Sequence, residues 1–137
     1  MASRLRERLI EHESYEKYPY SCSAEKLTIG VGHNLTDRGL PDHIIDQLLN
    51  WDIEIAIDDL EDLDPNWASY STNRQDALIE LSFALGKPNL TLFKKMWAAI
   101  KQETPDWEEA AAQLLDSKFA TQVGKRAHTL ADLLRSG

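Results

Sequence analysis

The sequence predicts a mostly helical α+β fold, in which a small sheet lobe and a helical lobe are joined by a long helix. Residues 27–33 alternate with the period of two that is typical of a strand, whereas apolar residues elsewhere recur at helical spacing. A length of 137 residues, 42% of them apolar, suffices for one hydrophobic core without disulfides. We therefore expect a single domain over residues 1–137, with the sheet lobe at about 15–40 and the helical lobe at about 65–137 plus the N-terminal helix.

The first helix is expected to begin after Ser3, a residue type that is common at helix N-caps, and to end near Glu13 or Ser14. Helical spacing places three apolar residues of this segment on one face, namely Leu5, Leu9 and Ile10.

The strand at residues 27–33 has two different faces. Its period of two places Thr28, Gly30 and Gly32 on the face that points away from the core, opposite the apolar residues. Glycines on a strand face leave room for a ligand or another backbone to come close. We therefore expect a ligand on this face.

The rest of the chain reads as helices. After turn residues at 36–39, a long helix is expected from Pro41 until the break at residues 64–66. Capping-box spacing at residues 72–75 predicts a helix that Gly86 ends, and its apolar residues surround the axis, as in a buried helix. Further helices are expected at about 92–100, from Thr104-Pro105 to about 115, and at about 125–135.

The acidic charge is concentrated in the first half of the chain. Residues 1–64 carry 6 Lys and Arg against 15 Asp and Glu, while residues 65–137 carry 9 against 8. A net charge of -8 without a basic stripe disfavours a nucleic-acid partner, because phosphate neutralisation supplies most of that affinity. The acidic run at 52–64 is interpreted as a solvated helix face, the alternative being a cation or partner site. A lone Cys22 excludes an intramolecular disulfide and a cysteine-based zinc cluster.

A carboxyl, a thiol and a hydroxyl occur early in the chain with the spacing Glu13-x8-Cys22-x5-Thr28. A loop and strand that return past the end of a helix can place these three groups around one cleft. Glycoside hydrolysis needs a carboxylic acid to protonate the leaving oxygen and a second group to activate water or attack the sugar. The spacing alone is a weak signal, since many acidic chains contain such a triplet.

The residues around this triplet resemble those of the phage-type lysozymes, the endolysins of glycoside hydrolase family 24. Their pattern is Glu, eight residues, Asp or Cys, five residues, Thr, and then Ile-Gly-x-Gly-His, which matches Glu13, Cys22 and the run from Thr28 to His33. Further stretches in the same order, such as 49–52, 77–86, 107–111 and 122–127, extend the resemblance over nearly the whole chain. It implies the lysozyme-like fold with a cleft between lobes, and hydrolysis of the β-1,4 bond between N-acetylmuramic acid and N-acetylglucosamine in peptidoglycan.

The resemblance implies that Glu13 is the general acid and that Cys22 and Thr28 position the attacking water. A thiol with a pKa of about 8.5 is a weaker base at pH 7 than the Asp found here in many relatives. Whether Cys22 positions water, acts as a base or attacks carbon stays open. The alternatives without a catalytic role are that Glu13 is a surface glutamate, that Cys22 is a small buried thiol and that Thr28 is an ordinary strand threonine. Ser14 stands where the family commonly has Gly.

The resemblance also implies binding and supporting residues. His33 pairs with Asp52 as a structural tie, the alternative being a substrate contact. Arg126 pairs with Glu13, the alternative being an ordinary surface arginine. Phe83 matches a position that lines the cleft, the alternative being an aromatic residue of the core. The cleft-lining positions are Gly30, Gly32, Phe83, Gln113 and Ser117.

The expected function is that of a muramidase (EC 3.2.1.17), a bacteriolytic phage endolysin for host cell lysis with antimicrobial action and with no cofactor or metal. The alternatives are a lytic transglycosylase that uses Glu13 alone and a catalytically silent peptidoglycan-binding domain. The expected partner is bacterial peptidoglycan. We expect a monomer with no membrane anchor, since no apolar run nears the roughly 18 residues that a membrane span needs. The charged opening lacks the apolar stretch of a secretory signal, so we expect synthesis in the host cytoplasm and action on periplasmic peptidoglycan after membrane permeabilisation.

Overall fold

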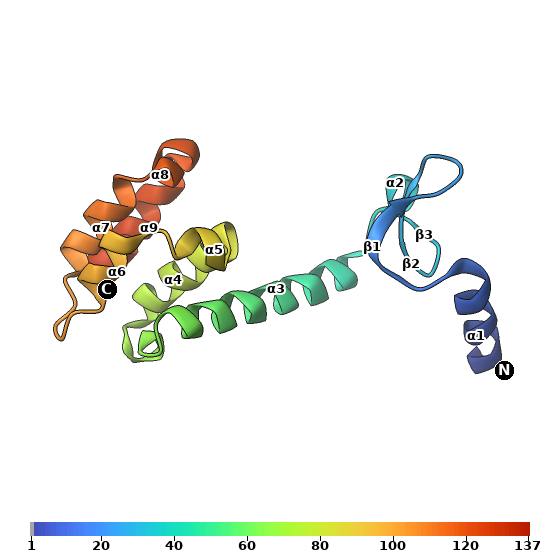
Figure 1. Ribbon diagram of the computed structural model, residues 1–137, viewed down its shortest axis with the longest axis horizontal. Helices are drawn as coiled ribbons and strands as arrows, with labels where there is room; N and C mark the ends of the chain where they lie inside the picture. Colours follow the sequence, from blue (N-terminus) through green and yellow to red (C-terminus); the bar gives the residue numbers. More distant parts are fainter. Residues whose placement is uncertain (1) are drawn as a thin grey trace. The chain divides into compact units, whose positions relative to one another are not determined.

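The computed structural model describes residues 2–137, and their contacts divide the chain into two compact units that meet within one long helix, at Gln47 and Leu48 (Figure 1). The first unit contains α1 (Ala2–Glu13), β1 (Glu16–Ser21), β2 (Leu27–Gly30), β3 (His33–Asn34), α2 (Leu35–Arg38) and the start of α3 (Asp42–Leu63). The second contains the rest of α3, η1 (Trp67–Ser69), α4 (Thr72–Leu85), α5 (Lys87–Leu90), α6 (Lys94–Ile100), α7 (Trp107–Leu115), α8 (Lys118–Val123) and α9 (Lys125–Ser136). The mostly helical α+β architecture is therefore confirmed. The prediction that the N-terminal helix joins the helical lobe stays a prediction.

The three strands form one antiparallel sheet in the order β1-β2-β3. Tyr20 of β1 lies opposite Thr28 of β2, and Thr28 lies opposite Asn34 of β3. The strand predicted to reach residue 33 ends instead at Gly30. Gly30 and Gly32 both have φ of +67°, a left-handed conformation that turns the chain back into β3.

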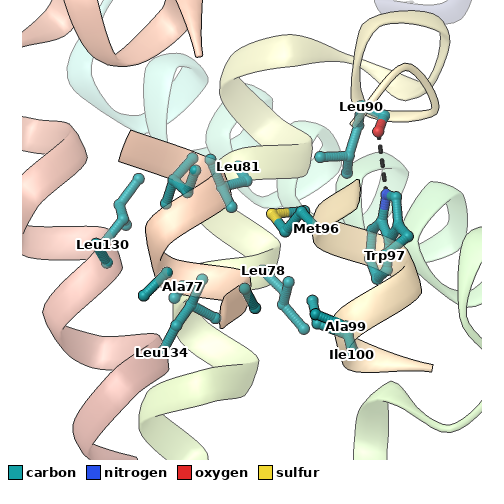
Figure 2. Packing of buried hydrophobic residues seen from close by; sticks show 14 of the residues in the cluster. Ala77, Leu78, Leu81, Leu90, Met96, Trp97, Ala99, Ile100, Leu130 and Leu134 are labelled. Carbon is teal, nitrogen blue, oxygen red and sulfur yellow. Dashed lines mark hydrogen bonds between the residues drawn. The ribbon is translucent and has the colours of Figure 1, made fainter. Parts of the chain in front are cut away.

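The hydrophobic core of the second unit lies where α4, α6, α7 and α9 meet, and α7 packs against both α6 and α9. Figure 2 shows Leu78 of α4 among side chains of the neighbouring helices. The Trp97 indole N–H donates to the Leu90 carbonyl oxygen at 3.0 Å, so this buried polar group is satisfied inside the core. The core side chains that are fully buried include Leu60, Leu78, Leu81, Leu90, Met96, Ile100, Leu114, Leu130 and Leu134.

Arg74 fastens the C-terminal end of α9 to α4. Its Nε and Nη2 donate to the carbonyl oxygens of Leu134 and Arg135 at 2.7 and 3.2 Å. These are carbonyls that a helix end leaves without intrahelical partners. The guanidinium also lies 4.6 Å from the centroid of the Trp107 ring, a cation–π geometry. Arg74 thus adds polar and cation–π contacts between α4, α7 and α9, which also pack together in the core.

The break after α3 is built around a buried carboxylate. Asp64 is 2% exposed and accepts hydrogen bonds from the Asn66 backbone N–H and the Tyr70 hydroxyl. Burial, together with the neighbouring Asp64 carboxylate, raises the pKa of the Tyr70 hydroxyl above its ordinary range. The predicted end of the long helix at residues 64–66 is thus confirmed, with an Asp-centred turn as its physical reason.

Several helix starts differ from the sequence predictions. The first helix begins at Ala2, so Ser3 lies inside it. Ser71, one residue before the predicted cap, accepts from the Arg74 N–H at the start of α4. Asp106 caps α7 in place of Thr104-Pro105, because its carboxylate can accept from the Glu109 N–H. Three short α-helices, α2, α5 and α8, were not predicted, since fewer than seven residues give too little periodicity, and α2 occupies most of the segment that was expected to be a turn.

Candidate active site

Glu13, the last residue of α1, lies against the turn that connects β2 to β3. A Cβ atom placed on Gly32 would be 2.9 Å from Glu13 Oε2 and 3.2 Å from Glu13 Cβ. Any side chain at position 32 would therefore displace the carboxyl group. Gly32 also has φ of +67°, which disfavours other residues for a second reason. Glu13 itself is solvent-exposed, so a ligand can reach its carboxyl group.

Ser14 turns the chain from the end of α1 towards β1. Its φ of +73° lies in the left-handed region, which is uncommon for a residue other than glycine. The conformation explains why glycine is the better residue here, and Ser14 adopts it at an energetic cost of about 1–2 kcal/mol. The backbone path after the acid is thus held by the structure around it.

Cys22 opens the loop between β1 and β2 and is surrounded by hydrogen-bond donors. The backbone N–H of Ala24 and then that of Lys26 lower the pKa of the Cys22 thiol, and the Thr28 hydroxyl adds to the effect. The loop is closed by two bonds between backbone groups at 2.9 Å, from the Cys22 N–H to the Lys26 carbonyl and from the Glu25 N–H to the Cys22 carbonyl. Backbone groups and a hydroxyl thus lower the pKa of this thiol, and no cationic side chain is among the causes.

Thr28 is 5% exposed, and the expectation that it points away from the core is therefore wrong. Its hydroxyl donates to the Lys26 carbonyl oxygen at 3.0 Å and also lies within hydrogen-bonding reach of the Cys22 sulfur. A hydroxyl has a single proton, so it serves one of these two acceptors at a time. While it donates to Lys26, its oxygen is free to accept a hydrogen bond from water.

Glu13 and the Cys22–Thr28 pair all lie in the first unit, in contact with β2 or with the turns at its two ends. Thr28 is within β2, Cys22 is in the loop before it, and Glu13 meets Gly32 just after it. One short strand therefore connects all three predicted catalytic residues. Gly30 is open: among the residues that the structure describes, no atom lies within 4 Å of a Cβ placed there.

His33 is bonded to a backbone carbonyl. Its Nε2 lies 2.6 Å from the Gly39 oxygen, and because a carbonyl can only accept, Nε2 must carry the proton. This bond ties β3 to the turn after α2, and sequence reasoning missed it because a carbonyl partner leaves no side-chain signal. Asp52 is exposed and belongs to the second unit, so the His33–Asp52 pair stays a prediction.

Phe83 and Arg126 line one groove of the second unit, with a volume of about 360 Å³. Phe83 is 45% exposed, which contradicts a core position and the expectation that its helix is buried on all sides. Arg126 Nε lies 3.9 Å from Glu80 Oε2, and both side chains are partly exposed, so this pair is weak. The predicted partner Glu13 lies in the other unit, and that pairing stays a prediction.

Gln113 and Ser117 line a different groove of the second unit. The Gln113 Nε2 donates to Glu109 Oε1 at 2.8 Å. The Ser117 hydroxyl caps α8 by accepting from the Ala120 N–H at 3.1 Å, and it donates to the Leu114 carbonyl at 2.6 Å. Helix capping therefore explains why a serine stands at position 117, and the spacing Ser-x-x-Ala did not reveal this role.

Within residues 2–137, no cluster of three or more His, Cys, Asp or Glu side chains could hold a metal ion. Of the described helices, none combines the length and the apolar character that crossing a membrane requires.

Comparison with known proteins gives two matches. The sequence model of the family described as phage lysozyme matches residues 10–134. The chain is also 25% identical, over 166 aligned positions, to the probable T4-type lysozyme 2 of Dictyostelium discoideum. That alignment covers the whole of this chain and 96% of the relative. Both matches include the segment that contains Glu13, Cys22 and Thr28.

Proposed function

Because this chain belongs to the phage lysozyme family and is a lysozyme-type hydrolase, we propose that it hydrolyses the β-1,4 bond between N-acetylmuramic acid and N-acetylglucosamine in peptidoglycan. The observation that carries the proposal is the position of Glu13. Its carboxyl group is exposed to solvent at a helix end and occupies the space that Gly32 leaves open by having no side chain. A positioned, accessible carboxylic acid is the group that glycoside cleavage requires.

In this mechanism Glu13 donates its proton to the glycosidic oxygen as the bond to the anomeric carbon breaks. A water molecule, held by Cys22 Sγ and the Thr28 hydroxyl oxygen, forms the new bond to that carbon. The water releases one proton to the surrounding solvent as the new bond forms, so that Cys22 and Thr28 act by positioning the water. The product has an inverted anomeric configuration, because water attacks the face opposite to the leaving group.

A turbidity assay on bacterial cells with a permeabilised outer membrane tests the activity, and mass analysis of the released fragments tests the reaction. Hydrolysis gives products with an ordinary reducing end, whereas a lytic transglycosylase gives an anhydro-sugar that is lighter by one water. Glu13→Gln is the matched control, since the amide keeps the shape and removes the transferable proton. A muramidase loses nearly all activity in this variant without a change in melting temperature. Murein binding without release of fragments in the parent protein would point to a catalytically silent binding domain.

The biological setting follows from the same proposal. The enzyme is a phage endolysin that is made in the host cytoplasm and reaches the periplasmic peptidoglycan once the inner membrane has been permeabilised. Lysis of intact cells that requires co-expression of a membrane-permeabilising protein supports this route. Lysis by the enzyme alone, when it is expressed in the cytoplasm of the host, would contradict it.

A further inference from the structure

One peptide group contacts both members of the Cys22–Thr28 pair. The carbonyl oxygen of Lys26 accepts hydrogen bonds from the Cys22 N–H at 2.9 Å and from the Thr28 hydroxyl at 3.0 Å. This carbonyl and the N–H of Leu27 belong to the same planar peptide unit, and because the bond is trans, the two groups point in opposite directions. The orientation of the Lys26–Leu27 peptide therefore determines the direction in which the Thr28 hydroxyl donates.

The other side of this peptide is bonded to a side chain that the reaction does not use. The Leu27 N–H donates to the Thr36 Oγ1 atom at 2.8 Å, and Thr36 belongs to α2. A hydrogen bond accepted from the N–H of a peptide polarises the whole group and makes its carbonyl oxygen a stronger acceptor. Thr36 therefore orients the peptide and also strengthens the two hydrogen bonds that its carbonyl accepts.

The short helix α2 is itself attached to the sheet through Asp37. The Asp37 carboxylate accepts from Lys26 Nζ at 3.1 Å and from Asn34 Nδ2 at 2.9 Å, and the Asp37 N–H donates to the Asn34 side-chain oxygen at 3.1 Å. Asn34 lies opposite Thr28 in the sheet. The Lys26–Asp37 pair is exposed and contributes little to stability, but it places α2 beside the start of β2. Thr36 is thereby kept within reach of the Leu27 N–H.

We infer that Thr36 is a positioning residue for the reaction and acts on Thr28 and Cys22 through the peptide between residues 26 and 27. The inference rests on the proposed function, in which this pair holds the attacking water. While the peptide is fixed, the Thr28 hydroxyl donates to its carbonyl and the hydroxyl oxygen accepts from the water. Without Thr36 the peptide can rotate, and the Thr28 proton then turns to the Cys22 sulfur. The water thereby loses the fixed direction of its attack.

Amide hydrogen exchange of the full chain, measured by NMR, tests this role without any substrate. Thr36→Val keeps the branched shape and removes the acceptor, so the Leu27 and Cys22 amides should exchange about fivefold faster, as the loss of one hydrogen bond predicts. Thr36→Ser keeps the acceptor and should exchange like the parent. The matched control is Thr129→Val, which removes an exposed helix hydroxyl that donates to the Lys125 carbonyl, and it should leave both amides unchanged.

Kinetics on murein fragments connect the hydrogen bond of Thr36 with the reaction. Thr36→Val should lower kcat about tenfold, because the water is misplaced, and should leave KM within about twofold, because Thr36 acts on the water and not on substrate binding. Thr36→Ser should restore most of the parent's kcat, and Thr129→Val should keep all of it. Asp37→Asn weakens only the exposed ion pair and should lower kcat less than Thr36→Val does.

The outcomes separate this role from the proposed function. A hydrolysing parent with an equal kcat in Thr36→Val would overturn the inference and leave the hydrolysis intact. Unchanged exchange of the Cys22 amide in Thr36→Val, or a loss of kcat that Thr36→Ser does not restore, would overturn it as well. A parent without hydrolysis, whose Thr36→Val variant still shows faster exchange at both amides, would refute the proposed function and support the contact between Thr36 and the pair.

Discussion

Gly32 and Glu13 are so close that a methyl group at position 32 would lie 2.9 Å from the Glu13 carboxyl oxygen. Gly30 has the same φ of +67°, yet a Cβ placed there meets no atom of the described residues within 4 Å. A comparison of the two glycines therefore separates the effect of the left-handed backbone from the effect of the space beside Glu13. Both tolerate a left-handed backbone, but only Gly32 makes room for the acid.

Gly32→Ala should lower kcat by at least tenfold, because the new methyl group displaces the Glu13 carboxyl from its position. Gly30→Ala should keep kcat within about threefold. The strained φ should cost each variant about 1–2 kcal/mol of unfolding free energy, so the measurement is made well below both melting temperatures. Equal kcat values for the two variants would mean that Gly32 does not position the acid.

The thiol of Cys22 should titrate below an ordinary cysteine, for which the pKa is about 8.5, because backbone N–H groups and Thr28 stabilise the thiolate. Folding lowers this pKa, so the associated stabilisation is present above the unfolded-state value and is lost as the pH falls through the folded-state value. The pH dependence of alkylation by iodoacetamide measures the pKa of Cys22 in the folded protein, and the same chain in urea gives the reference for the unfolded state.

Thr28→Val should raise the pH at which Cys22 alkylation is half-maximal, since the hydroxyl no longer assists the thiolate. Ser23→Ala changes a neighbouring hydroxyl and should have no effect on it. An identical titration curve in the folded protein and in urea would show that the loop leaves the thiol unperturbed.

Substitutions of Cys22 distinguish water positioning from nucleophilic attack. If Cys22 holds or deprotonates water, Cys22→Asp should stay active and Cys22→Ser should keep measurable activity, with an inverted product anomer in both. A nucleophilic Cys22 requires a retained anomer in the parent and a nearly inactive Cys22→Ser. NMR of the products immediately after cleavage identifies the anomer. A sugar trapped covalently on Cys22 would decide against water positioning.

The helix ends that could be predicted from sequence are those that local chemistry determines. The Asp64-Pro65 break and the Gly86 end are both confirmed, because a proline or a left-handed glycine stops a helix in nearly any surroundings. The end of β2 was missed because the glycines of residues 27–33 were assigned to an extended strand, although two positive φ values make them a turn.

The residues of the candidate site stay a prediction from the resemblance, and their contacts could not be predicted from the sequence. The resemblance pointed to the segment that contains Glu13, Cys22 and Thr28. The donors on Cys22 and the acceptor of His33 are backbone groups, which any sequence contains. The burial of Thr28 depends on the pairing of three strands, and the division of Phe83 and Gln113 between two grooves depends on helix packing. Neither follows from periodicity within one element.

Ser14→Gly should raise the free energy of unfolding by about 0.5–1 kcal/mol. The left-handed φ of +73° costs a residue with a Cβ about 1–2 kcal/mol, and glycine removes this cost. Part of that stabilisation is lost again, because glycine has greater conformational freedom in the unfolded chain. Urea unfolding at constant m-value measures the difference.

Two controls isolate the backbone as the cause of this stabilisation. Ser14→Ala removes the hydroxyl but keeps the Cβ, so its stability should stay close to that of the parent. Ser23→Gly adds a glycine where φ is not positive and should therefore lower stability, because only the entropic cost remains. If Ser14→Ala were as stabilising as Ser14→Gly, the hydroxyl group and not the left-handed backbone would be the source of the cost. Activity should survive in Ser14→Gly, since glycine relieves strain beside Glu13 while leaving the chain path from α1 to β1 unchanged.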